Sequence, residues 1–306
     1  MSVPNDELVH IAFATDGRDV IALAAAMAST LRNLKSPAQV SVATTPDVAI
    51  TLRRRIESVA EAATSETRVR WTNIATEEIN RLPRVGHLPP FTFARLLLFD
   101  RLVECDRLIY LDTDLISRRD VGELWASDIS GNVVGAAIDR TLLTLGAERA
   151  IPYCLQTEAL DPTAPYFNAG VLLVDLLEWR RQEITRKTLA FVERYRGQLN
   201  FADQDALNAV LAGRWSRIEG DWNYVVRAHA AHSGRQDPMR EERIYHFAGS
   251  HKPWNSGLRH SGRLAFFAEL AASGWFSRTE LLKWKLGWSM SAVSKGLRRR
   301  IGGTSA

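Results

Sequence analysis

Two aspartates separated by one residue, Asp112 and Asp114, directly follow the apolar segment Leu108–Leu111. In an extended chain, side chains two positions apart point to the same side, so both carboxylates can bind one cation. A divalent cation in such a place screens a pyrophosphate and stabilises it as a leaving group. The pattern is weak by itself, because the chain has a second Asp-x-Asp at Asp203 and Asp205. A solvated strand end is the alternative interpretation.

A second candidate is the segment from His246 to Trp254, which reads His-Phe-Ala-Gly-Ser-His-Lys-Pro-Trp. A single histidine in an apolar stretch is more often structural, but the residues after it favour chemistry. Gly249 permits a close backbone approach, and Lys252, one of only six lysines, supplies a positive charge for phosphate oxygens. An imidazole beside two carboxylates suits Mn²⁺ better than Mg²⁺, which prefers oxygen ligands alone.

The elements that must position these residues alternate between strand and helix. Strands are expected at His10–Ala14, Val40–Ala43, Val69–Trp71, Leu108–Leu111, Val133–Ile138, Val171–Val174 and Ile244–Phe247. Helices are expected at Val20–Asn33, Ile50–Ala63, Phe93–Leu102, Leu176–Tyr195, and from a cap at Asp203 through Ala212. This alternation predicts an α/β fold with a largely parallel sheet and with ligands outside the carboxyl ends of its strands. Three of the strands end in or near a carboxylate or an amide, which predicts a site at that edge.

The composition is that of an ordinary globular protein, with 306 residues, 46% hydrophobic and 24% charged. This excludes collagen-like and disordered chains. The longest apolar run begins at Val20 and meets Ser29 and Thr30, so it is shorter than the ~18–20 residues of a membrane span. Asp6 and Glu7 stand where a secretory signal would be basic, and two cysteines are too few for a disulfide framework. We therefore expect a cytoplasmic protein.

Positive charge is concentrated at the C-terminal end. Residues 275–306 carry seven basic side chains and one acidic one, a net charge of +6, whereas the whole chain carries +4. The other 274 residues therefore carry −2. A nucleic-acid-binding protein usually places its basic residues on its folded face, so this distribution favours a different anionic partner and no nucleic acid.

Six motifs in this order resemble glycosyltransferase family 8, most closely its bacterial lipopolysaccharide α-galactosyltransferases and α-glucosyltransferases. The motifs are Ile11-Ala-Phe-Ala-Thr-Asp16, Thr92-Phe-Ala-Arg95-Leu, Tyr110-Leu-Asp112-Thr-Asp114, Tyr166-Phe-Asn168-Ala-Gly170-Val, Asp203-Gln204-Asp205-Ala-Leu-Asn208 and His246 to Trp254. The resemblance spans roughly residues 8 to 255. It implies a GT-A fold, with a mostly parallel mixed sheet flanked by helices, a UDP-hexose donor, Mn²⁺, and transfer with retention at the anomeric carbon.

The resemblance also implies a role for each matching residue. The metal ligands are then Asp112, Asp114 and His246. Ala14 and Asp16 meet the uracil and ribose end of UDP, and Gly249 and Lys252 meet the diphosphate. The residues expected around the donor sugar are Arg95, Asp139, Asn168, Asp203 and Gln204. In one departure, Gly17-Arg18-Asp19 stands where related enzymes often have an aromatic residue that stacks on uracil.

The expected mechanism follows from Gln204, which the resemblance places opposite the anomeric carbon. Double displacement needs a nucleophile there, and an amide oxygen is a poor one. We therefore favour a front-face reaction, in which the acceptor hydroxyl attacks from the side that UDP leaves and a phosphate oxygen takes its proton. Gln204 and Asp203 then stabilise the positive charge that develops on the sugar ring.

Three other classes of protein compete with this interpretation. Phosphatases of the haloacid dehalogenase type also have a strand-terminal Asp-x-Asp, but close to the N-terminus and without a counterpart of residues 246–254. Sugar nucleotidyltransferases have a similar fold but need a Gly-rich, basic loop after the first strand, which Thr15-Asp16-Gly17 is not. A catalytically silent, lectin-like relative would lack the metal ligands that this chain has.

The chain divides into a catalytic domain, residues 1–255, and a basic helical segment, residues 256–306. Apolar residues recur there at helical spacing, at Leu282, Leu286, Met290, Val293, Leu297 and Ile301, close to Trp275, Trp284 and Trp288. Indole rings favour the headgroup boundary, and basic residues favour anionic lipid. We expect this segment to hold the enzyme on the inner membrane face, near an acceptor such as lipopolysaccharide core or another glycolipid. The alternative is a terminal helix that packs on the catalytic domain.

Overall fold

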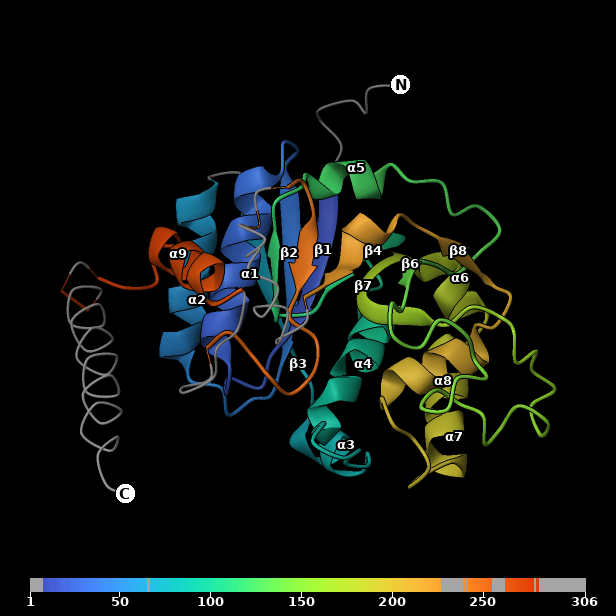
Figure 1. Ribbon diagram of the computed structural model, residues 1–306. Coiled ribbons are helices and arrows are strands. Elements are labelled where there is room, and N and C mark those ends of the chain that lie inside the picture. The colour runs from blue at the N-terminus through green and yellow to red at the C-terminus, as the bar shows by residue number, and fades with distance from the viewer. Residues whose placement is uncertain are drawn as a thin grey trace, which may run out of the picture.

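The structure is a computed structural model that describes residues 8–64, 67–226, 239, 241–254, 262–277 and 279–280. Within these residues, the main sheet has seven strands in the order β3-β2-β1-β4-β7-β6-β8 (Figure 1). The strands are β1 (Val9–Ala14), β2 (Ala38–Thr44), β3 (Thr67–Asn73), β4 (Arg107–Leu111), β6 (Val134–Ile138), β7 (Phe167–Asp175) and β8 (Trp215–Arg217). All adjacent pairs are parallel except those of β7, which runs antiparallel to β4 and β6.

A second sheet of three strands lies beside the main one, in the order β5-β10-β9. Its strands are β5 (Leu115–Ser117), β9 (Tyr224–Val225) and β10 (Ile244–His246). The pair β5 and β10 is antiparallel, and β10 and β9 are parallel. All seven expected strands are present, and the sequence analysis did not predict β5, β8 or β9.

Helices cover both faces of the main sheet, as expected for an α/β fold (Figure 1). One face is covered by α1 (Val20–Asn33), α2 (Ile50–Ala63), α5 (Val121–Trp125) and α9 (Arg263–Ala272). The other is covered by α3 (Thr76–Asn80), α4 (Ala94–Arg101), α6 (Leu176–Arg181), α7 (Ile184–Arg194) and α8 (Asp203–Val210). Short 3₁₀ helices lie at Pro90–Phe93 and Gly220–Asn223.

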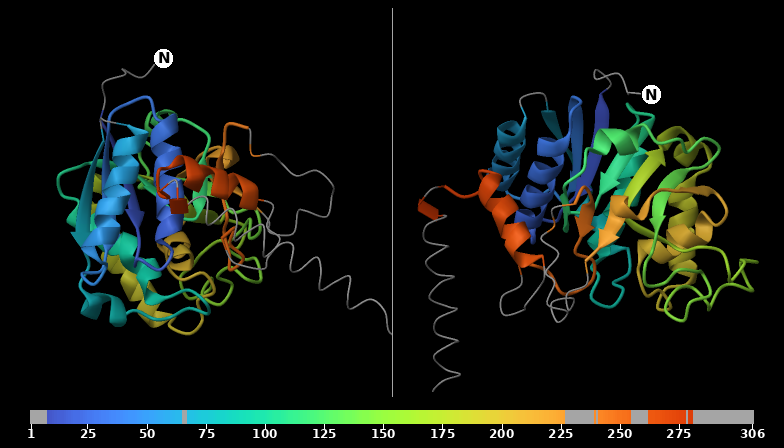
Figure 2. Two further views of the ribbon diagram at one scale, coloured as in Figure 1. Left: turned by 90° about the vertical axis from the view of Figure 1, so that its left-hand side faces the viewer. Right: turned by 45° about the horizontal axis from the view of Figure 1, so that its top comes forward.

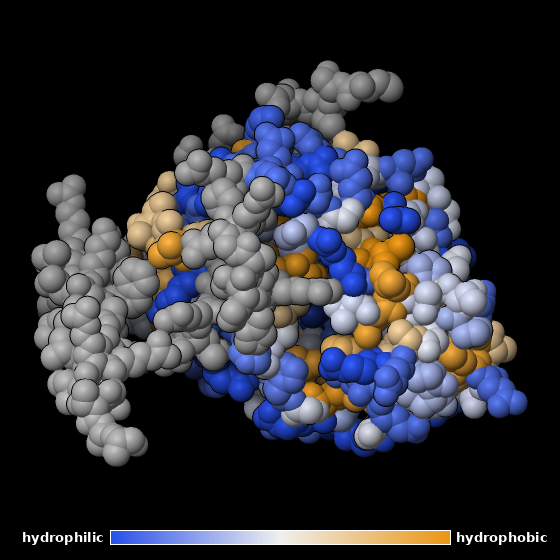
Figure 3. All heavy atoms as spheres, in the orientation of Figure 1, coloured by the Kyte–Doolittle hydropathy of each residue, from blue (hydrophilic) through white to orange (hydrophobic). Residues whose placement is uncertain are grey.

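The sheet separates two hydrophobic cores because side chains alternate along each strand. In β4, Leu108 and Tyr110 belong to one core, whereas Ile109 and Leu111 belong to the other. Among the coloured residues of the face seen in Figure 3, hydrophilic residues alternate with hydrophobic patches. No helix among the described residues is both apolar enough and long enough to span a membrane.

The helical pattern from Leu176 to Tyr195, expected as one helix, forms two. It is broken at Glu183, whose φ of 53° lies in the left-handed region, so α6 ends before it and α7 begins after it. In addition, the side chain of Trp179 donates through Nε1 to Thr185 Oγ1 at 2.9 Å, which ties the two helices together across the break. Periodicity alone does not reveal such a break, because α6 and α7 both bury apolar residues against the same core.

The described part of the C-terminal segment packs on the catalytic domain. Helix α9 lies across α1 (Figure 2), and the carboxylate of Glu269 forms ion pairs with both Arg32 and Arg118. Just beyond α9, Trp275 is only 5% exposed, and the guanidinium of Arg55 stands 4.3 Å from its ring. The other residues of the expected helical segment, 256–261, 278 and 281–306, lie outside the described residues.

Candidate active site

The antiparallel direction of β7 gathers polar residues from three strands at one edge of the main sheet. Asp112 follows β4 and Asp139 follows β6, while Asn168 lies at the beginning of β7. The amide of Asp112 donates to the carbonyl of Gly170 at 2.8 Å, and the amide of Asp139 donates to the carbonyl of Tyr166 at 2.9 Å. The start of β7 therefore lies between the ends of its two neighbours, and the predicted site edge is formed.

The second sheet brings His246 to the same edge. His246 is the last residue of β10 and pairs with Leu115 of β5, one position after Asp114. The next residue along, Phe247, donates its amide to the carbonyl of Asp114 at 2.8 Å. This pairing of three residues in each strand thus brings His246 next to Asp114, although more than 130 residues separate them in the sequence.

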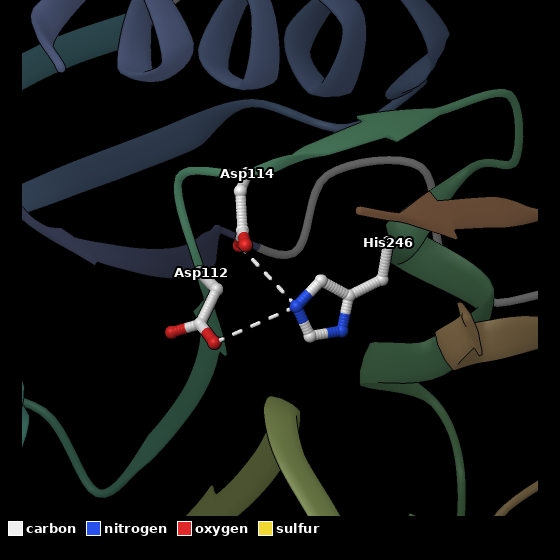
Figure 4. Close-up of side chains that lie close together, drawn as sticks. All are labelled: Asp112, Asp114 and His246. Carbon is white, nitrogen blue, oxygen red and sulfur yellow. Dashed lines mark ion pairs between the residues drawn. The ribbon is translucent and has the colours of Figure 1, made fainter. Parts of the chain in front are cut away.

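Asp112, Asp114 and His246 form a compact group whose potential ligand atoms all lie within 4.8 Å of one another. Nε2 of His246 is 3.2 Å from Oδ1 of Asp114 and 3.8 Å from Oδ2 of Asp112 (Figure 4). The imidazole is buried, and the two carboxylates are partly exposed. Two carboxylate oxygens and one imidazole nitrogen around a common point are a suitable donor set for a divalent transition metal.

The oxygen that each aspartate turns away from His246 is held by a cation. Oδ1 of Asp112 lies 3.0 Å from Nη2 of Arg95, and it also accepts from the hydroxyl of Tyr110 at 3.1 Å. Oδ2 of Asp114 forms an ion pair with Lys252. Burial raises the pKa of Asp114, but its interactions with the Lys252 charge and with the His246 ring outweigh burial and hold that pKa well below its usual range. Asp114 is therefore ionised at neutral pH and available as a ligand.

Arg95 connects the two groups of carboxylates. It extends from α4, is 6% exposed, and its Nε lies 2.7 Å from Oδ2 of Asp203 while Nη1 donates to the carbonyl of Ala169 at 2.6 Å. Burial raises the pKa of Asp203 to about 6, although the Arg95 charge acts in the opposite direction. The prediction that Asp203 caps its helix is wrong. Asp203 is the first residue inside α8, Ala202 is the N-cap, and the carboxylate is turned toward Arg95.

The side chain of Gln204 is fixed against the beginning of β7. Its Oε1 accepts a hydrogen bond from the amide of Ala169 at 3.0 Å, and its Nε2 lies 3.4 Å from the hydroxyl of Tyr166. Ala169 therefore bonds to Arg95 through its carbonyl and to Gln204 through its amide. The two residues expected to act on the sugar ring, Asp203 and Gln204, are thereby attached to the same strand that carries Asn168.

The remaining predicted residues surround this group. The side-chain Nδ2 of Asn168 donates to Oδ2 of Asp139 at 2.9 Å, and both residues are 7% exposed. Ala14 ends β1, where the pairing of Ala12 with Tyr110 places it level with Asp112. Asp16 lies in the loop that follows, away from these bonds, and accepts from Nε of Arg18 at 2.7 Å.

The loop after β1 also contacts the segment that follows β10. Nε1 of Trp254 donates to Oδ1 of Asp19 at 3.1 Å, which joins the expected uracil end of the site to the expected diphosphate end. Within that segment, Gly249 has a φ of 90°, a conformation that glycine adopts without strain, and a Cβ there would meet no atom of the described residues within 4 Å. The backbone at Gly249 is therefore open to an approaching ligand.

The sequence analysis missed Asn223, Tyr110 and Gly170. Asn223 is 2% exposed and places Oδ1 at 2.8 Å from Nδ1 of His246. Gly170 and Tyr110 stand within quoted motifs, but neither was assigned a role there. Asn223 had no signal in the sequence, because it lies in the 3₁₀ helix Gly220–Asn223, and tertiary contact alone brings it to the site.

Comparison with known proteins identifies this arrangement. Residues 10–257 match the family described as Glycosyl transferase family 8. The chain belongs to this family. Among curated relatives, General stress protein A of Bacillus subtilis is 26% identical over 88% of this chain and 96% of its own length. Lipopolysaccharide 1,2-glucosyltransferase of Escherichia coli K12 is 25% identical over 66% of this chain, which spans only 60% of that enzyme.

The chain is also similar in structure to a solved glycosyltransferase. The galactosyltransferase LgtC, determined with donor and acceptor sugar analogues, superimposes with a TM-score of 0.72 and 26% identity, covering 89% of this chain and 98% of LgtC. The expected GT-A fold, with its mostly parallel sheet between helices, is therefore confirmed. These matches give no support to a haloacid dehalogenase-type phosphatase or to a sugar nucleotidyltransferase.

Proposed function

We propose that this family 8 glycosyltransferase transfers a hexose, galactose or glucose, from a UDP-hexose to a saccharide acceptor with retention of anomeric configuration. The observation that carries the proposal is the convergence of Asp112, Asp114 and His246 beside Arg95 and Asp203 at one sheet edge. A cation site next to buried polar side chains matches a substrate with a diphosphate at one end and a hydroxyl-rich sugar at the other.

The donor set favours Mn²⁺ over Mg²⁺, because it includes an imidazole nitrogen. A bound Mn²⁺ screens the diphosphate and stabilises the UDP leaving group. The position of Lys252 supports this role. Its amine forms an ion pair with Asp114, a proposed ligand of the ion, and so stands beside the cation site. In the donor complex we expect Lys252 to bind a diphosphate oxygen next to the open backbone at Gly249, with Ala14 and Asp16 at the uracil and ribose end.

The sugar end of the site is lined by Arg95, Asp139, Asn168, Asp203 and Gln204. Their carboxylates and amides can hydrogen-bond sugar hydroxyls. Asp203 is buried and ion-paired with Arg95, and Gln204 has its carbonyl oxygen bonded to a backbone amide. Neither is a free nucleophile. This supports a front-face reaction, in which the acceptor hydroxyl attacks on the side that UDP leaves and a donor phosphate oxygen takes its proton. Gln204 and Asp203 then stabilise positive charge on the ring.

The acceptor class is proposed from the relatives, one of which is a lipopolysaccharide 1,2-glucosyltransferase. We propose lipopolysaccharide core or another glycolipid as the acceptor, and a peripheral position on the inner membrane face. The basic residues and tryptophans after Glu280 support contact with anionic lipid. Trp275 does not contribute to that contact, because it is buried under Arg55.

The experiment is UDP release from UDP-galactose and UDP-glucose, measured with Mn²⁺, with Mg²⁺ and with chelator. We expect release with Mn²⁺ and loss of release with chelator. In parallel, the preferred donor should raise the melting temperature in the presence of Mn²⁺, because it binds only the folded protein. Full UDP release in chelator, or release of a free phosphate or a pyrophosphate in place of UDP, would contradict the proposal.

A further inference from the structure

The side of His246 that faces away from the two aspartates is also occupied. Nδ1 of the ring lies 2.8 Å from Oδ1 of Asn223, and His246 and Asn223 are 3% and 2% exposed. This contact belongs to a continuous row of hydrogen bonds that runs from Asp139 through Asn168 and Asn223 to His246. The chemistry of the groups around Asn168 fixes the direction of every bond in the row.

At Asn168, the two ends of the amide are distinguished by their neighbours. A backbone N–H can only donate, and the amide of Gly170 lies 3.0 Å from Oδ1 of Asn168. On the other side, Nδ2 of Asn168 lies 2.9 Å from Oδ2 of Asp139, a carboxylate whose other oxygen accepts from the amides of Thr141 and Leu142. Turning the Asn168 amide over would break both bonds, so its oxygen faces Gly170 and its NH₂ group faces Asp139.

This orientation determines the next two groups. The same oxygen of Asn168 lies 2.8 Å from Asn223, which must therefore present its NH₂ group there and turn its own oxygen to His246. An amide oxygen only accepts hydrogen bonds, so Nδ1 of His246 must carry a proton. Nε2 is then the nitrogen that faces Asp112 and Asp114 and can offer a lone pair to a cation.

We propose that Asn223 is a positioning residue that holds His246 as a ligand through Nε2, with Asn168 and Asp139 fixing the direction of the bond. This inference rests on the metal site of the proposed function. It gives Asn168 and Asp139 a second task besides any contact with the donor sugar. Metal affinity then also depends on Asn223, although Asn223 is not itself a ligand and acts through His246.

The test compares Asn223→Leu, which removes the acceptor, with Asn223→Asp, which keeps an acceptor opposite Nδ1. In metal-free protein labelled with ¹⁵N-histidine, we expect an imidazole Nδ1–H resonance of His246 that is protected from exchange in the wild type. His246→Gln identifies the resonance by its loss. The resonance should persist in Asn223→Asp and disappear in Asn223→Leu. Mn²⁺ affinity should fall by ~10–100-fold in Asn223→Leu and by less in Asn223→Asp. The electron paramagnetic resonance signal of free Mn²⁺ measures this affinity.

Asn208→Ala is the matched control. Asn208 is as buried as Asn223, and it bonds to β7, the strand that carries Asn168. Its Oδ1 accepts from the backbone amide of Phe167, and its Nδ2 donates to the carbonyl of Phe167. Its loss should lower stability but leave the His246 resonance and Mn²⁺ affinity unchanged. The proposal is overturned if wild-type Nδ1 carries no proton, a result that does not depend on the folding of any variant. It is also overturned if Asn223→Leu and Asn208→Ala weaken Mn²⁺ binding equally. Absence of Mn²⁺ binding in the wild type with the Nδ1–H resonance present would contradict the metal site of the proposed function and, with it, the ligand role of His246, but not the orientation of the ring by Asn223.

Discussion

The imidazole of His246 lies directly over Gly170, where a Cβ atom would stand 2.2 Å from Cε1 and 2.7 Å from Nδ1 of the ring. The backbone of Gly170 also accepts from the amide of Asp112 and donates to the side chain of Asn168. Gly170 therefore bonds both to the proposed ligand Asp112 and to Asn168 in the row of hydrogen bonds behind His246. Because it has no side chain, it also leaves room for the imidazole ring.

From this contact we expect Gly170→Ala to displace the His246 ring and to weaken Mn²⁺ binding by ~10-fold or more, as loss of an oriented ligand does. Gly220→Ala is the control, because a Cβ at Gly220 meets none of the described atoms within 4 Å and its φ is not positive. Titration of both variants with Mn²⁺ decides the matter. Equal affinity in the two variants would show that the ring adapts to the added methyl group.

Removal of the proposed ligands should abolish transfer without unfolding the protein. We expect Asp112→Ala, Asp114→Ala and His246→Ala each to lose Mn²⁺-dependent UDP release and to keep the wild-type circular dichroism spectrum. The reason is that two ligands of the three bind the cation poorly, whereas the core packing of each strand is retained. An Asp112→Ala, Asp114→Ala double variant that is fully active in chelator would refute the metal assignment.

Gln204→Ala should lower kcat by ~10²–10³, the loss expected for one positioned electrostatic group. Because its carbonyl oxygen accepts from the amide of Ala169, the side chain is held in place before any donor binds. Intact-mass spectrometry during turnover should detect no glycosylated protein in the wild type or the variant. A covalent sugar on Gln204 or Asp203 would establish double displacement in place of the front-face reaction.

Asp205 gives a prediction about stability and pH. Burial raises its pKa to about 6 from an ordinary value of 3.8, although it accepts bonds from Tyr166, Asn200 and Phe201. A carboxyl whose pKa is higher in the folded state binds its proton more tightly there, so this group favours folding as the pH falls through 6. When the pH falls from 7 to 5, the free energy of unfolding of the wild type should therefore increase by about 1 kcal/mol relative to that of Asp205→Asn. Denaturant unfolding at the two pH values measures the difference, and an unchanged difference would mean that Asp205 keeps an ordinary pKa.

Deletion of residues 281–306 should abolish co-sedimentation with anionic liposomes and leave turnover on a small soluble acceptor intact. The cut preserves α9 and Trp275, which are packed on the catalytic domain through Glu269 and Arg55. Deletion from residue 262 onward is the comparison, and it should destabilise the protein, because it leaves Arg32 and Arg118 without their buried partner. If the shorter deletion also causes aggregation, the segment after Glu280 is part of the fold rather than a membrane contact.

The sequence by itself determined the elements of this protein and most of the types of residue at its site. Val20–Asn33 and Ile50–Ala63 are helices with the bounds that periodicity predicts, and each expected strand is present. Local pattern suffices for these, because an amphipathic helix or an apolar strand has one way to bury its side chains. The ordered motifs likewise predicted Asp112, Asp114 and His246 as one group.

The tertiary structure alone decided how these residues meet. The antiparallel direction of β7 brings Asn168, at the start of a strand, to the edge where β4 and β6 end. The sequence predicts Asp203 as a helix cap, but Ala202 is the N-cap of α8, and the carboxylate of Asp203 pairs with the buried guanidinium of Arg95. Asn223 reaches His246 through a contact between residues that share no local pattern. Such relationships depend on strand direction and on charges that are distant in sequence, so no local spacing contains them.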